Sequence, residues 1–116
     1  MTQRKAFWIA FGLLIVVAIA IGGLGDKSLG VTYQNETGQT VIVYPYGRNY
    51  PAVKRVLGAG GKQTDNLLGD PQSTTQVARI EAVDESGNLI YCQSFIFGEL
   101  GANGGVIHIR LGESNC

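Results

Sequence analysis

The sequence predicts an all-β domain, a small antiparallel β-sandwich, preceded by one N-terminal transmembrane or signal helix. Short runs rich in β-branched and aromatic residues recur along the chain, and each run ends at turn residues. Seventeen glycines against three prolines suit a turn-rich β domain better than a helical one. An apolar stretch over residues 6–25 precedes the first of these runs. With 116 residues, the chain has room for one domain.

The apolar stretch at residues 6–25 contains no charged side chain, and Arg4 and Lys5 stand directly before it. As a helix, at about 1.5 Å per residue, it would reach about 30 Å, which matches the hydrocarbon thickness of a bilayer. The two basic residues favour a cytoplasmic N-terminus, and Trp8 stands where tryptophan prefers the membrane interface. We therefore expect a transmembrane anchor whose C-terminal domain is extracytoplasmic.

A cleavable signal peptide is the alternative interpretation of the same residues. Ala18 and Ala20 supply a small-x-small cleavage pattern, and Ala20 with Gly22 supplies a second one. The apolar stretch is longer than the about 7–15 residues usual in a signal peptide, which favours an uncleaved anchor. Either way the chain divides into three parts: residues 1–25 as anchor or signal, 26–30 as a short linker and 31–116 as the extracytoplasmic domain.

The charges argue against a nucleic-acid partner. Nine Lys and Arg residues balance nine Asp and Glu residues, so the formal net charge is zero. A nucleic-acid-binding domain would instead carry a clustered basic face.

Three strands are expected in the first half of the exported part. Residues 31–35 form the first run, which ends at a Glu-Thr-Gly turn. Residues 40–46 form an apolar run typical of a central strand, and Pro45 should fall near its end because proline cannot donate to a ladder. Residues 52–57 form a weaker third run that is closed by glycines.

The middle of the chain contains a polar region and then a hairpin. Residues 62–75 are polar and contain Gly-Asp-Pro, which predicts mainly a loop, although residues 65–68 could form a short strand. Residues 76–83 alternate between apolar and charged side chains, and residues 89–97 are rich in apolar and aromatic ones. Residues 84–88 supply turn residues between these two runs, so we expect an antiparallel pair.

The last expected strand, residues 106–111, alternates most regularly. Every second residue from Ile107 to Leu111 is apolar, and the residues between them are polar. This alternation indicates one buried and one solvent-facing side, as in an antiparallel sheet. We expect this strand to pair with residues 89–97 across a loop at 98–105. Six or seven short strands of this kind favour an immunoglobulin-like or transthyretin-like sandwich.

The two cysteines, Cys92 and Cys116, are expected to form an intramolecular disulfide. In the predicted hairpin, Cys92 falls opposite about Leu111, and the tail after Leu111 could return Cys116 to within the roughly 7 Å Cα separation that a disulfide needs. Outside the cytoplasm such a pair usually oxidises. The alternatives are that Cys92 is a small buried apolar residue and that Cys116 stays free or links two copies. The sequence contains no CxxC motif, the cysteine spacing that would suggest a redox enzyme.

No catalytic, cofactor or metal site is expected. His108, the one histidine, lies on the polar side of its strand without metal-ligand spacing around it, and no GxSxG motif is present. The glycine-rich residues 58–64 contain Gly-Lys but not a P-loop, because Val56 and Gln63 occupy positions that need Gly and Ser or Thr. The Asn-Glu-Thr triplet at Asn35 matches an N-glycosylation acceptor and predicts an exposed turn at most.

One stretch has the composition of a recognition surface and contains Tyr44, Tyr46, Arg48 and Tyr50. Tyrosine and arginine combine large amphipathic area with hydrogen bonding, and both are enriched at interfaces. The alternative is a strand end and loop whose tyrosines only cover the edge of the core.

These observations favour a non-enzymatic protein that is held in a membrane through residues 6–25. Its exported domain would serve binding or assembly, with a protein or an envelope polymer as the partner. A secreted binding protein, released by signal cleavage, is the second interpretation. A small extracytoplasmic hydrolase is the third.

Overall fold

A computed structural model describes residues 27–116, so the predicted span at residues 6–25 lies outside the described residues. No helix in residues 27–116 is long and apolar enough to cross a membrane. The described elements, eight strands and one short helix, are in chain order β1 (Ser28–Asn35), β2 (Val41–Tyr44), β3 (Arg55–Leu57), β4 (Lys62–Leu68), β5 (Val77–Val83), β6 (Leu89–Ile96), α2 (Phe97–Ala102), β7 (Val106–Ile109) and β8 (Glu113–Ser114).

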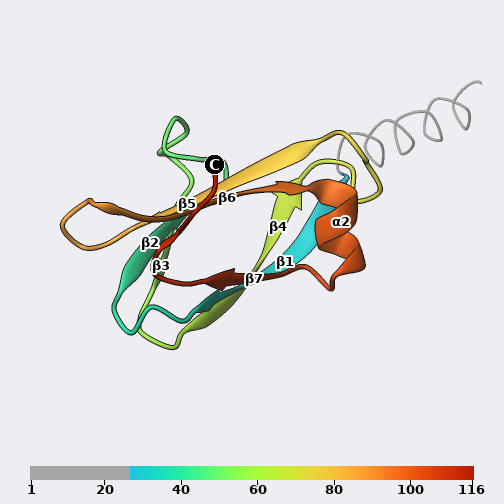
Figure 1. The fold of residues 1–116 in the computed structure, drawn as a ribbon. Helices are drawn as coiled ribbons and strands as arrows, with labels where there is room; N and C mark the ends of the chain where they lie inside the picture. The colour runs from blue at the N-terminus through green and yellow to red at the C-terminus, as the bar shows by residue number, and fades with distance from the viewer. Residues whose placement is uncertain (1–26) are drawn as a thin grey trace, which may run out of the picture.

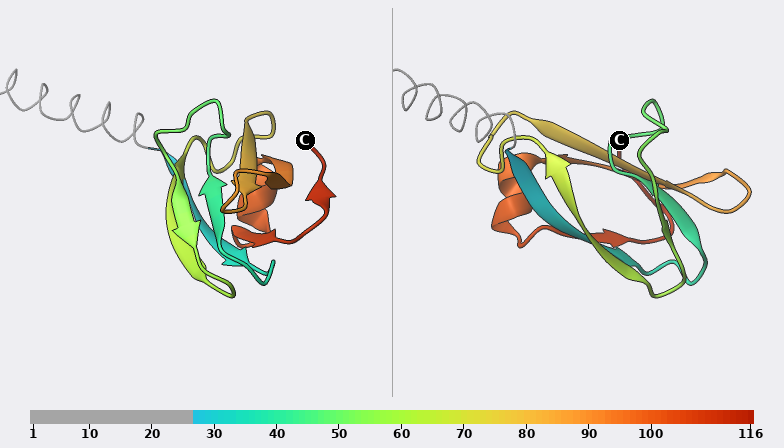
Figure 2. Two further views of the ribbon diagram at one scale, coloured as in Figure 1. Left: turned by 90° about the vertical axis from the view of Figure 1, so that its left-hand side faces the viewer. Right: turned by 180° about the vertical axis from the view of Figure 1, so that it is seen from behind.

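The strands form two sheets that share one hydrophobic core (Figure 1). The smaller sheet has the strand order β4-β1-β7, and the larger sheet has the order β3-β2-β5-β6-β8. Helix α2 lies at the end of the domain where β1 begins, as the further views in Figure 2 also show. The prediction of an all-β fold is confirmed.

Alternation along the strands places every second side chain in the core. In β1, Leu29, Val31 and Tyr33 are buried, and β7 contributes Ile107 and Ile109 from the neighbouring strand. Removing this apolar surface from water is the main favourable contribution to folding. The other core residues come from both sheets and from α2: Val41, Val43, Leu57, Leu67, Ala78, Ile80, Ala82, Tyr91, Phe97 and Leu100.

A polar cluster joins the two sheets where the edge strands β3 and β4 meet. Arg55 of β3 forms an ion pair with Asp65 of β4, with 3.1 Å between Nε and Oδ2. The Tyr33 hydroxyl donates to the same Oδ2 at 3.2 Å. Burial and the neighbouring Asp65 raise the pKa of Tyr33, so its hydroxyl stays protonated and remains a donor.

The expected hairpin between residues 89–97 and 106–111 is wrong. Strand β7 lies in the smaller sheet and runs parallel to β1, whereas β6 lies in the larger sheet. The expected loop at 98–105 contains most of α2, which carries the chain from one sheet to the other. At the end of this crossover Gly105 has φ +71° and packs against the Gly30 backbone, where a Cβ atom would clash. Only glycine allows this close approach.

Parallel pairing also corrects the prediction of a purely antiparallel sandwich. The pairs β1–β7 and β6–β8 are parallel, and the other strand pairs are antiparallel. Strand β8, which was not predicted, adds to the edge of β6, with Cys92 opposite Ser114. Because β7 ends at Ile109, Leu111 is 56% exposed and does not continue the buried face.

Strand β4 is longer than the sequence predicts. The region expected to be mainly loop forms a strand over Lys62–Leu68, paired residue by residue with β1 from Ser28 to Gln34. Leu67 is its one fully buried apolar side chain, so the strand lacks the apolar alternation by which strands are recognised. Because its pairing with β4 includes Ser28, β1 begins there, inside the range expected to be a linker.

Asn35 is a buried hydrogen-bonding centre at the end of β1 and is 1% exposed. Its Nδ2 atom donates to the carbonyl oxygens of Gln39, Leu57 and Gly58 at 2.7, 3.1 and 2.9 Å. Its Oδ1 atom accepts from the backbone N–H and the hydroxyl of Thr37. The exposed turn predicted from the glycosylation triplet is therefore wrong for Asn35, because its side chain is buried and its amide group is hydrogen-bonded within the fold.

We expect Asn35→Asp to destabilise the domain by roughly 3 kcal/mol or more, because a buried carboxylate would face three carbonyl oxygens. Chemical denaturation of the purified chain measures this difference. The matched control is Asn66→Asp on the exposed side of β4, which should change the free energy of unfolding by about 0.5 kcal/mol or less. Equal effects of the two substitutions would contradict the structural role of Asn35.

Candidate functional site

The candidate site lies on the outer face of the larger sheet, the face turned away from the core. Tyr44 of β2, Glu81 of β5 and Cys92 of β6 lie opposite one another in the strand register. Directly opposite residues share a face, so these three side chains project from the same side of the sheet. The neighbouring trio of Val43, Ala82 and Tyr91 projects into the core instead.

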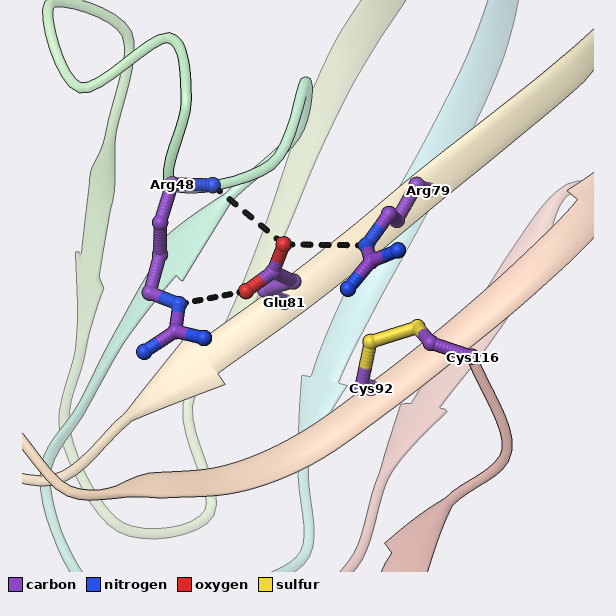
Figure 3. The surroundings of a disulfide bond; sticks show 5 residues. All are labelled: Arg48, Arg79, Glu81, Cys92 and Cys116. Atoms are coloured by element: carbon purple, nitrogen blue, oxygen red, sulfur yellow. Dashed lines mark hydrogen bonds and ion pairs between the residues drawn. A yellow bond between two sulfur atoms is a disulfide. The ribbon is translucent and has the colours of Figure 1, made fainter.

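The loop after β2, residues 45–54, folds back over this outer face and covers Glu81. The Glu81 side chain is only 6% exposed, although its strand position points away from the core. Arg48 donates its Nε to Oε2 at 2.5 Å and its backbone N–H to Oε1 at 3.4 Å. Arg79, two residues before Glu81, donates its Nε to Oε1 at 3.0 Å. Figure 3 shows the two guanidinium groups on either side of the carboxylate.

The electrostatic balance at Glu81 favours the ionised carboxylate. Burial of the side chain raises its pKa, but the hydrogen bonds from Arg48 and Arg79 outweigh this effect. The net result is a pKa below the ordinary value of 4.5. Glu81 is therefore a fixed negative charge that binds two arginines at neutral pH.

Gly47 makes the close approach of the loop to Glu81 sterically feasible. Its φ is +80°, and a Cβ atom here would lie 3.2 Å from Oε1 of Glu81. Its backbone N–H donates to the Tyr44 carbonyl at 3.1 Å, which closes the turn after β2. Glycine adopts this left-handed conformation without the steric cost that a side chain would impose.

The predicted disulfide between Cys92 and Cys116 is confirmed, with 5.4 Å between the Cα atoms. It closes next to Glu81 on the same outer face, as Figure 3 shows. The path of the tail differs from the expected one, in which the tail folds back after a 106–111 strand paired with residues 89–97. Instead the tail forms β8, which pairs parallel with β6. The backbone N–H of Asn115 donates to the Cys92 carbonyl at 2.7 Å, which holds the tail beside the strand.

The four residues predicted as a recognition surface have different environments. Tyr44 is half-buried on the outer face, and Arg48 is engaged with Glu81. The Tyr46 hydroxyl accepts the Leu68 backbone N–H at 3.0 Å. Tyr50 is 60% exposed, and its ring lies edge-on to Tyr46 with 6.2 Å between ring centroids.

A shallow apolar hollow of about 310 Å³ lies beside the Tyr46 and Tyr50 rings. Val53 and Leu68 complete its lining, and Leu68 is 64% exposed. The hollow joins the loop after β2 to the end of β4, although these elements belong to different sheets. Such a surface can accept an apolar group of a partner.

His108 lies away from this surface, on β7 of the smaller sheet, and is exposed. Its Nδ1 lies 2.5 Å from Oε2 of Glu36, and Arg110 approaches the other oxygen at 3.6 Å. The hydrogen bond with His108, aided by Arg110, lowers the pKa of Glu36. Across residues 27–116, no three His, Cys, Asp or Glu side chains form a group that could hold a metal ion.

The roles of Glu81 and Arg79 were missed at the level of sequence. The alternation in residues 76–83 places both on the polar side of their strand, but it does not indicate what covers that side. A Gly-Arg pair two residues after a strand-ending proline was the available signal that the loop turns back sharply.

Comparisons of the chain with protein-family models, with curated proteins and with solved structures found no match.

We expect the contribution of Glu81 to stability to be present above pH 4.5 and lost in more acid solution, because its pKa is lowered by folding. Glu81→Gln should therefore cost roughly 2 kcal/mol at neutral pH through loss of charged hydrogen bonds. The difference between the two proteins should shrink as the pH falls below 4.5. Chemical denaturation across this range tests the prediction, and a difference that does not change with pH would contradict it.

Proposed function

We propose that the chain is a single-pass, membrane-anchored protein whose extracytoplasmic β-sandwich domain has a non-catalytic role in binding or assembly. The anchor is residues 6–25, whose length and lack of charge suit a bilayer span. The Cys92–Cys116 disulfide supports an extracytoplasmic location, since disulfides persist in oxidising compartments. Two sheets around one core support a sandwich, which we infer to be immunoglobulin-like or transthyretin-like.

The observation that carries the binding role is the exposed ring of Tyr50 beside the apolar hollow. Tyr46 holds this surface in place through its hydrogen bond with Leu68 and its edge-on contact with Tyr50. A rigid aromatic surface loses little conformational entropy when a partner binds, which favours affinity. The partner we infer is a protein or an envelope polymer that offers an apolar group to the hollow.

A secreted binding protein is the second candidate, and the small-x-small pattern at Ala18 and Ala20 favours it. A small hydrolase has less support. His108 contacts the Glu36 carboxylate, but within residues 27–116 it makes no hydrogen bond to a Ser, Thr or Cys that could act as a nucleophile.

We expect carbonate extraction of membranes to leave the protein in the pellet, with the intact mass of the full 116-residue chain. An apolar span of this length partitions into lipid, whereas a peripheral protein is released by alkali. A mature chain that begins near residue 21 or 23 and is found in the soluble fraction would contradict the anchor and support the secreted form.

We expect Tyr50→Ser to lower chemical crosslinking of the full-length chain to its partner in intact cells by roughly tenfold or more, as for a central aromatic of an interface. The melting temperature should stay near the wild-type value, because Tyr50 is 60% exposed. Leu111→Ser is the matched control, since Leu111 is 56% exposed but lies elsewhere.

Crosslinking that survives Tyr50→Ser, or that falls equally in the Leu111 control, would contradict this surface. Tyr46 and Arg48 are unsuitable first choices for the test. Tyr46 bonds the β4 backbone and Arg48 bonds Glu81, so their loss would disturb the loop as well as the surface.

A further inference from the structure

Two arginines share the single buried carboxylate of Glu81, which leaves one positive charge in excess. Arg48 and Arg79 are 48% and 55% exposed in their side chains, whereas Glu81 is 6% exposed. The negative charge of Glu81 therefore lies beneath the two arginine side chains, which reach solvent. An anion approaching this face meets cationic groups first.

Fixing the loop requires only one of these arginines. Arg48 lies in the loop and gives Glu81 both its Nε and its backbone N–H. Arg79 lies on the same strand as Glu81, so its contact ties no separate segment to the sheet. A structural explanation of the cluster accounts for Arg48 but leaves Arg79 without a comparable role.

The terminal Nη groups of both arginines remain free for a ligand. Both contacts with Glu81 use Nε, and among residues 27–116 neither Nη pair has a hydrogen-bond partner. In each guanidinium the Nε–H points to the buried Glu81 carboxylate, whose two oxygens are both engaged. Ser94 lies opposite Arg79 in the strand register and adds an exposed hydroxyl to the same face.

We propose that the Nη groups of Arg48 and Arg79, oriented by Glu81, bind a carboxylate or phosphate group of the ligand. The planar guanidinium presents two parallel N–H donors that match the oxygens of these anions. The inference rests on the binding role proposed above and deepens it, because it assigns the chemistry of one ligand group. Tyr46 and Leu68 of the apolar hollow also line a second pocket together with Arg79, so one ligand can place an apolar part in the hollow and its anionic part at the arginine pair.

The test titrates the full-length chain in neutral detergent with three soluble probes: inorganic phosphate, acetate and glycerophosphoglycerol. Phosphate represents a free anion, acetate a carboxylate, and glycerophosphoglycerol a lipid-type phosphodiester. NMR of the arginine Nε–H groups is the direct readout in the wild-type protein. At least one probe should shift the Arg48 and Arg79 signals in a saturable manner, and the strongest probe identifies the source of the anion.

Arg79→Gln is the main variant, because Arg79 fixes no loop. It should weaken binding of the strongest probe by roughly tenfold, the effect of losing one charged pair. The matched control is Arg110→Gln, which removes the same charge from a side chain 51% exposed next to Glu36, and it should bind as the wild type does. Added sodium chloride should weaken binding to the wild type and to Arg110→Gln, the two proteins that keep both arginines of the site.

Two results would overturn the proposal. One is the absence of saturable shifts at Arg48 and Arg79 with all three probes. The other is an equal loss of affinity in the Arg79 and Arg110 variants, which would indicate only a response to net charge. Neither result bears on membrane extraction or on crosslinking through Tyr50, so failure of the anion site remains distinguishable from failure of the proposed function.

Discussion

The buried carboxylate of Glu81 is the constraint on which the outer face of the larger sheet depends. Strand alternation turns Glu81 away from the core, where a carboxylate would ordinarily meet water. The loop after β2 covers it, and the cost of removing this charge from water is offset by three donors from Arg48 and Arg79. Because Arg48 contributes both backbone and side chain, the same carboxylate holds the loop that carries Tyr46 and Tyr50 against the sheet.

The disulfide imposes a second constraint on the same face. A two-residue strand such as β8 has too few backbone hydrogen bonds to hold a chain terminus by itself. The bond from Cys116 to Cys92 closes this tail against β6 and limits the freedom of the unfolded chain, a contribution of roughly 3 kcal/mol for a loop of this length. Segments distant in sequence thus meet around Glu81: the loop after β2, strands β5 and β6, and the C-terminal residue.

Sequence alternation predicted where strands lie better than how they pair. The period of two located β5 and β7 to within a few residues, and apolar and aromatic content located β6. The period of two did not predict which strand pairs with β7, since Ile107 could be buried in either sheet. The crossover depends on Gly105 fitting against the backbone of Gly30, a contact between residues far apart in sequence. Of strand β4 only residues 65–68 were expected as a possible short strand, because backbone pairing with β1, and not apolar alternation, defines its full length.

Residue composition predicted the tyrosine and arginine residues of the loop after β2 as a candidate site, but it did not predict Arg79. Tyr50 was predicted because tyrosine and arginine are enriched at interfaces, whereas Tyr46 and Arg48, predicted on the same ground, also make contacts that the fold needs. Arg79 was missed because a charged residue on a strand's polar side is ordinary. Its significance appears only against Glu81, whose charge Arg48 already balances. Within residues 27–116, the exposed Tyr50 ring and the arginine Nη groups without hydrogen-bond partners are therefore where binding chemistry should be sought.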